Sequence, residues 1–204
     1  MPNTDAPPVT TAGGRYNGVA MALHWLIAGL LIWNILIAWS FEDLRGVARI
    51  APTQLHKSIG ITVLLLSLVR LGWRFVRPPP PLPATIRGWE RGVAHVVYVL
   101  FYVVMIGLPV TGRAMVSASR LIHVFPITLF NVVPWPAIAP LSNLPADQMR
   151  TAHEGFEIAH GLLGKLSYLQ ILLHVGAALR HLVLLRDGVV GRMIPFLPTP
   201  KSPS

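Results

Sequence analysis

The chain has 204 residues, of which 53% are hydrophobic and only 12% are charged, and its formal net charge is +9. Average soluble domains contain about 25% charged residues, so this composition indicates a membrane protein. The chain contains no cysteine, which excludes structural disulfides, cysteine-ligated zinc, iron–sulfur clusters and covalently attached c-type haem. The basic balance is typical of short loops that orient a chain in a bilayer, and nucleic-acid binding is not expected.

The two ends of the chain are polar. Residues 1–14 lack a basic stretch followed by a short apolar run, so we do not expect a cleaved signal peptide. We expect residues 1–14 to form a flexible N-terminal tail and residues 197–204 a C-terminal tail. The sequence between them, residues 15–196, is expected to form one domain.

Four segments are apolar over the length of about 20 residues that a helix needs to cross a bilayer. In the second, Lys57, Arg70 and Arg74 lie near the ends, where long basic side chains can reach the interface. The predicted fold class is an all-α membrane protein, a four-transmembrane-helix bundle. The expected spans are residues 18–40, 54–76, 92–112 and 158–180.

A fifth apolar stretch, residues 123–140, contains four prolines. Prolines remove backbone donors and break helices, so we expect an interfacial loop here and not a fifth span.

Basic residues are divided unequally between the two sides of these spans. Ten lie on the side of the termini, and six lie on the opposite side. Since basic loops stay in the cytoplasm, we expect both termini of the chain to be cytoplasmic. The six outer residues are Arg45, Arg49, Lys57, Arg113, Arg120 and Arg150.

Histidines inside the spans are the main functional signal, because polar groups at membrane depth are costly and are usually functional. His160 and His174 are fourteen residues apart, which places them within about 40° of one helix face and about 21 Å apart along it. From the direction of each span, His24 is expected level with His174 near the inner side. His56 is expected level with His160 near the outer side. Two such cross-helix pairs predict axial ligation of two non-covalent b-type haems inside the bundle.

A different class of function also fits buried histidines. Imidazole serves proton paths and transition-metal sites, so a His-lined proton or metal transporter without haem remains an alternative.

Two glycines follow the candidate ligands at the same spacing. Gly60 and Gly164 lie four residues after His56 and His160, one turn along on the same face. A missing side chain would let a flat macrocycle lie close to the backbone, although ordinary packing of membrane helices explains glycine equally well.

Several other polar residues have open roles. We expect His153 in the outer loop and His123 in the proline-rich loop. His95 and His181 are expected at the inner side. Arg70 is expected either to bind a haem propionate or to face lipid, and the sequence does not decide between them.

The motifs in combination resemble the bacterial cytochrome b561 family over about residues 15–196. They are "RYNGVAMALHWL", "LHKSIGITVLLLSLVRLGWRF", "AHVVYVLFYVVMIGLPVTG", "HGLLGKLSYLQILLHVGAALRH" and "RMIPF". The resemblance implies a four-helix di-haem cytochrome whose ligand positions fall on His24, His56, His160 and His174. Related b-type subunits of nickel–iron hydrogenase and formate dehydrogenase share this plan.

The resemblance also implies a multi-pass protein of the bacterial inner membrane that transfers electrons across it, between a periplasmic-side donor and the quinone pool. One branch of the family oxidises superoxide outside and reduces ubiquinone near the inner haem. An alternative is a membrane-anchor cytochrome b subunit that relays electrons for a partner enzyme. The chain departs from the family in its long outer loop and in Lys165, which is expected off the haem face.

Overall fold

The computed structural model describes residues 14–41, 43–81 and 87–199. The expected tails, residues 1–14 and 197–204, lie largely outside the described residues. Four long helices form the fold, and each is long and apolar enough to cross a membrane, so the chain is an all-α membrane protein as predicted. The helices are α1 (Gly18–Ser40), α2 (Ile50–Val76), α3 (Gly88–Ser117) and α5 (Ala146–Leu179).

Only α1 has the bounds that were expected from the sequence. The other three are longer, because the prediction followed apolar runs while the helices continue through polar residues beyond them. A 3₁₀ turn, η1 (Gly46–Arg49), precedes α2, and a π-helical turn, η3 (Arg180–Leu185), continues α5. The prediction that His153 lies in a loop was wrong, because this residue is inside the extended start of α5.

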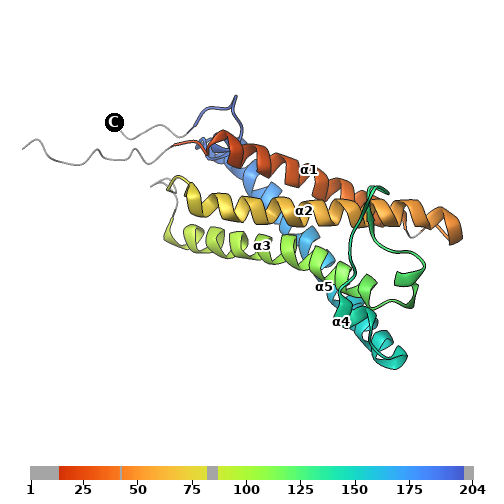
Figure 1. Ribbon diagram of the computed structural model, residues 1–204. Helices are drawn as coiled ribbons and strands as arrows, with labels where there is room; N and C mark the ends of the chain where they lie inside the picture. The colour runs from red at the N-terminus through yellow and green to blue at the C-terminus, as the bar shows by residue number, and fades with distance from the viewer. Residues whose placement is uncertain (1–13, 42, 82–86, 200–204) are drawn as a thin grey trace, which may run out of the picture.

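The helices pack in an open order. The helix α1 lies along α2, α2 along α3, and α3 along α5, whereas α5 has no extensive backbone contact with α1 or α2. Figure 1 shows α1, α2 and α3 side by side, with α5 crossing behind them. Ile27, Ile59, Val63 and Met105 form a buried core that joins α1, α2 and α3. The space between α5 and the pair α1–α2 is therefore left to side chains.

The connection between α3 and α5, residues 118–145, is irregular, as its prolines predicted. It contains a 3₁₀ turn, η2 (Arg120–His123), a short antiparallel pair, β1 (Thr128–Leu129) with β2 (Val133–Pro134), and the short helix α4 (Ala139–Ser142). It packs on α2, where the backbone N–H of Phe130 donates to the hydroxyl oxygen of Ser58 at 2.9 Å. It also packs on α3, where the N–H of Ile138 donates to Ser117 at 3.0 Å.

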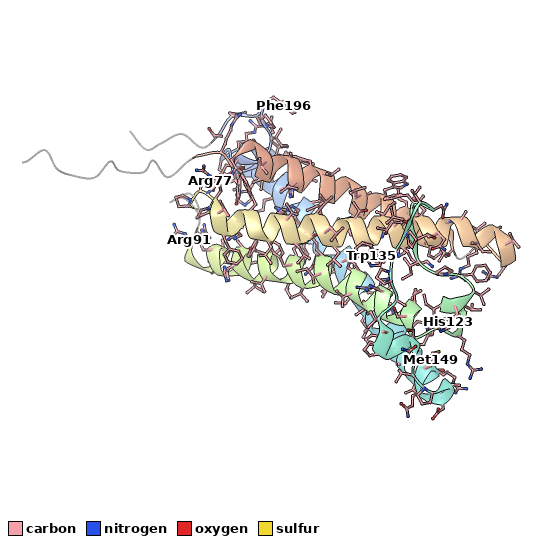
Figure 2. The ribbon with its side chains drawn as sticks, viewed as in Figure 1. Arg77, Arg91, His123, Trp135, Met149 and Phe196 are labelled. Atoms are coloured by element: carbon pink, nitrogen blue, oxygen red, sulfur yellow. The ribbon has the colours of Figure 1, made fainter. Side chains whose placement is uncertain are left out.

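Arg192 holds several chain segments together at the end of the bundle that lies opposite the connection between α3 and α5. Arg192, in the 3₁₀ turn η4 (Val190–Arg192), is buried and donates to the carbonyl oxygens of Gly14, Pro80 and Pro81 at 2.8–3.1 Å. These bonds tie the segment before α1 and the segment after α2 to the C-terminal segment. Figure 2 places Arg77, Arg91 and Phe196 at this end, which is called inner because the sequence predicts it to be cytoplasmic. His123, Trp135 and Met149 lie toward the opposite end, which is called outer.

Candidate functional site

The inner histidine pair joins α1 to α5. The ring centroids of His24 and His174 are 6.1 Å apart, and the planes of the rings are inclined at 66°. Aromatic side chains surround them, with the Phe101 ring 5.3 Å from His174 and the Trp25 ring 5.2 Å from His24. The two rings thus meet across helices that touch through side chains, as Trp39 and Tyr168 also do at 3.2 Å.

The outer histidine pair joins α2 to α5. The centroids of His56 and His160 are 6.2 Å apart, and the planes are inclined at 77°. Phe41, directly after α1, places its ring 5.4 Å from that of His56. The structure therefore brings together the two pairs that spacing and direction predicted, while the role of these residues as haem ligands stays a prediction.

The spacing of both pairs fits two imidazoles on opposite sides of one metal ion. A metal–nitrogen bond to histidine is about 2.0 Å, and the ring centre lies about 1.2 Å behind the nitrogen, so trans ligands have centres about 6.4 Å apart. The separations of 6.1 and 6.2 Å are close to this value. Within the described ranges, no third His, Cys, Asp or Glu completes either pair as a metal cluster. The donor set thus fits an iron whose other ligands come from a porphyrin.

Main-chain carbonyls fix the tautomer of both outer histidines. The Nδ1 atom of His56 is 3.2 Å from the carbonyl oxygen of Asn34, and that of His160 is 3.0 Å from the carbonyl oxygen of Leu108. A carbonyl can only accept, so each Nδ1–H donates. The Nε2 lone pair of each neutral ring is then free to coordinate a metal, which is the usual arrangement of ligating histidines.

The motif "GLPVTG" on α3 brings this helix close to α5. A Cβ atom at Gly107 would lie 3.1 Å from Leu163, and a Cβ at Gly112 would lie 3.0 Å from Cε1 of His160. The His160 ring therefore rests directly on the backbone at Gly112. Thr111 contributes a hydroxyl oxygen 3.3 Å from Nδ1 of His160. Sequence reasoning missed these positions, although two glycines five residues apart in one motif were a usable signal.

The predicted glycines make no such close contact. A Cβ at Gly60 would meet only the side-chain nitrogen of Asn34, at 3.7 Å, and a Cβ at Gly164 would meet nothing within 4 Å. Neither glycine is therefore required by the packing of the helices. Their role in accommodating a haem stays a prediction.

The remaining histidines have other partners. Nδ1 of His181 lies 2.6 Å from Oδ2 of Asp187, and Nδ1 of His153 donates to the carbonyl oxygen of Met115 at 2.8 Å. His95 lies against the Tyr98 ring at 6.2 Å, and His123 lines a surface cavity of the outer connection. Lys165 is exposed on α5.

A groove of about 440 Å³ lies between α2 and α3. Above it the guanidinium of Arg74 lies 3.9 Å from the centre of the Tyr98 ring, and the rings of Tyr98 and Tyr102 are 5.0 Å apart. The groove is lined by Leu71, Tyr98, Val99, Tyr102, Val103, Ile106 and Gly107.

Known proteins that resemble this chain identify its family. The family model described as prokaryotic cytochrome b561 matches residues 15–196. The chain is 29% identical over 185 residues to the protein named probable superoxide oxidase CybB of Yersinia pestis, covering 89% of this chain and 96% of that protein. It is 28% identical over 193 residues to cytochrome b561 homolog 2 of Escherichia coli K12, covering 91% of this chain and 94% of that protein. It is 27% identical over 191 residues to cytochrome b561 homolog 1 of the same organism, covering 89% of this chain and 97% of that protein. The chain therefore belongs to the prokaryotic cytochrome b561 family of b-haem proteins, which transfer electrons in membranes.

Proposed function

We propose that residues 15–196 form one domain that holds two b-type haems and moves electrons between an outer-side donor and the quinone pool. His24 and His174 would hold the inner haem, and His56 and His160 the outer one. The observation that carries this proposal is the matched 6.1 and 6.2 Å spacing of the two pairs in a member of this family. Gly60 and Gly164 would leave room for the macrocycles.

When bound, the haems supply one-electron redox chemistry. The chain holds the imidazoles in position and keeps the Nε2 atoms of the outer pair unprotonated, through the carbonyls of Asn34 and Leu108. Two histidines would hold each haem iron, and this pairing would favour outer-sphere electron transfer over oxygen binding. The helix α5 supplies one ligand to each site, fourteen residues apart, and so fixes their separation at about 21 Å along the helix.

Charge supports an orientation with both termini in the cytoplasm of a bacterial inner membrane. The inner end of the bundle carries an excess of arginines, among them Arg77 and Arg91, as expected of a cytoplasmic surface. The outer end carries Arg45, Arg49, Arg113 and Arg120. Such a basic surface would raise the local concentration of a small anion.

The groove between α2 and α3 supports a quinone as the acceptor. Its lining atoms are apolar, including those that Tyr98 and Tyr102 contribute. Small-molecule sites in proteins are lined mostly by hydrophobic and aromatic side chains. Ubiquinone could enter from the lipid, with its head group near the inner pair.

Superoxide is our first candidate for the donor. The relative from Yersinia pestis is named a probable superoxide oxidase, and the basic outer surface suits an anionic donor. A second candidate is a membrane subunit that relays electrons for a partner enzyme. The outer connection favours this reading because it exposes Val124, Phe130 and Val132, and exposed apolar patches mark interaction sites.

The haem content of the purified protein tests the proposal. We expect a b-type α-band in the reduced-minus-oxidised spectrum and two haems per chain in a pyridine haemochrome assay. One haem per chain would refute the paired sites, and no α-band in material expressed with ample haem would favour a transporter. Superoxide added to proteoliposomes that contain quinone should reduce the haems. No reduction would favour the relay subunit.

A further inference from the structure

Arg70 occupies on α2 the place that His174 occupies on α5. It follows His56 by fourteen residues, as His174 follows His160. Both helices begin at the outer end of the bundle and end at the inner one. Because the rings of His56 and His160 are in register at 6.2 Å, equal spacing brings Arg70 level with His174. Fourteen residues also keep it within about 40° of the face that carries His56.

The surroundings of Arg70 contain cations, histidines and tyrosines. Its guanidinium is half-buried and lies within electrostatic range of His24 and His174. The other groups near it are Arg74 and the hydroxyls of Tyr16, Tyr98 and Tyr102. In the described parts of the chain, no Asp or Glu forms an ion pair with Arg70. An arginine inside a membrane helix normally pairs with an opposite charge or a carbonyl, so Arg70 is suited to bind an anion that does not come from the described part of the chain.

We propose that Arg70 binds a carboxylate group of the haem held by His24 and His174. The inference rests on the proposed haem at the inner pair. A guanidinium is planar and offers two parallel N–H donors that match the two oxygens of a carboxylate. The same charge stabilises the electron that arrives at this site, and so raises its reduction potential. A lipid phosphate offers similar chemistry, and the experiment separates these two sources.

The chain supplies matched controls. Lys57 follows His56 directly and lies within electrostatic range of it, so it is the basic neighbour of the outer pair. Arg74 lies one turn after Arg70 but stacks on Tyr98 at 3.9 Å. Replacing each by glutamine removes one charge at a different distance from the inner pair.

The test measures the holoprotein in a maltoside detergent free of phosphate and in phospholipid nanodiscs. Spectroelectrochemistry gives the midpoint potential of each haem, and transfer to apomyoglobin gives each rate of haem loss. In Arg70→Gln we expect a lower inner potential and about tenfold faster loss of the inner haem in both media, with the outer haem unchanged. Arg70→Lys should recover most of the potential but little of the retention, since an ammonium group does not make the bidentate contact. Lys57→Gln should move only the outer potential, and Arg74→Gln should move the inner one less than Arg70→Gln does.

Three results would overturn the assignment. An inner potential and a loss rate that are both unchanged in Arg70→Gln would show that Arg70 binds no haem carboxylate, while two haems in the wild-type protein would leave the proposed function intact. An effect seen only in phospholipid would assign the anion to a lipid phosphate. Equal movement of both potentials would indicate a general structural change. Absence of an inner haem from the wild-type protein is a separate outcome, which refutes the proposed function itself.

Discussion

The two histidine pairs have nearly the same ring spacing but are held by different interactions. Both outer rings donate from Nδ1 to main-chain carbonyls, one on α1 and one on α3. In the described residues, neither inner ring has a hydrogen-bond partner, and Phe101, Trp25 and the charge of Arg70 surround them instead. The backbone of the bundle thus sets the orientation of the outer rings, whereas packing and charge define the inner site.

This difference predicts the direction in which an electron moves. A hydrogen bond from Nδ1–H to a carbonyl makes the imidazole a more basic ligand, which favours oxidised iron and lowers the outer potential. Arg70 favours the reduced state at the inner site. Lys57 acts against the hydrogen bonds, but its ammonium group is more strongly hydrated than the guanidinium of Arg70 and sits on a more flexible stem, so its charge acts less on the outer site. The inner potential should therefore be the higher one, which suits an outer donor and an inner acceptor.

Removal of one ligand from each site should have the largest effect. We expect His160→Ala to lose the outer haem and His174→Ala to lose the inner one. Each variant would then keep one haem per chain in the pyridine haemochrome assay. The potential that remains should be the lower one in His174→Ala and the higher one in His160→Ala, as measured by spectroelectrochemical titration.

A single contrary result would locate a different inner ligand. Retention of both haems in His174→Ala would point to His181, the next histidine in the chain, which lies in η3. The structure disfavours His181 as a haem ligand, because its Nδ1 atom lies 2.6 Å from Oδ2 of Asp187.

A methyl group at Gly112 should disturb the outer pair alone. The added Cβ would lie 3.0 Å from Cε1 of His160, so the ring must shift away from the carbonyl of Leu108. We expect Gly112→Ala to weaken binding of the outer haem, because the required shift of a few tenths of an ångström approaches the displacement of about 0.5 Å that ligand sites tolerate. Absorption and electron paramagnetic resonance spectra of the two haems would measure this effect.

Gly161→Ala is the matched control for this change. Gly161 is exposed on α5, and a Cβ there meets nothing within 4 Å. An unchanged outer haem in Gly112→Ala would mean that the contact relaxes without cost. Equal losses in both variants would indicate a general effect of alanine on these helices.

The sequence predicted the parts of the molecule that follow from periodicity. Four apolar runs predicted four membrane helices, and the fourteen-residue spacing of His160 and His174 predicted both pairs. The helix ends were set too short, because polar turns such as the start of α5 extend helices beyond the apolar region. The same arithmetic could have placed Arg70 beside the inner pair, since it also lies fourteen residues after a candidate ligand.

The contacts that hold the outer rings could not be predicted from side chains. The acceptors are the main-chain oxygens of Asn34 and Leu108, and every residue carries such a group. Which carbonyl faces a histidine depends on the relative rotation and depth of two helices, and no local pattern encodes either. The contact of Gly112 with His160 has the same origin, because these residues are 48 positions apart in the chain.

Removal of the Thr111 hydroxyl should have the smallest effect. It tests whether a side chain helps the main-chain carbonyl of Leu108 to hold the His160 ring. The hydroxyl oxygen lies 3.3 Å from Nδ1 of His160, while its own proton can be donated to Gly107 at 2.7 Å. Thr111→Val keeps the shape and removes this second acceptor, but the carbonyl of Leu108 still accepts at 3.0 Å. We therefore expect both haems to remain, with a change at the outer site of about 1 kcal/mol or less.

Thr62→Val separates this effect from the loss of an ordinary threonine bond. Thr62 on α2 donates to the carbonyl oxygen of Ser58 at 2.9 Å, as Thr111 donates within α3, but among the described residues it makes no hydrogen bond to a histidine. A change in the outer potential in Thr111→Val but not in Thr62→Val would assign the effect to Nδ1 of His160. If Thr111→Val leaves the potential unchanged, the main-chain carbonyl alone fixes the ring. If Thr111→Val loses the outer haem altogether, the Leu108 bond is insufficient and the main chain does not dominate the outer site.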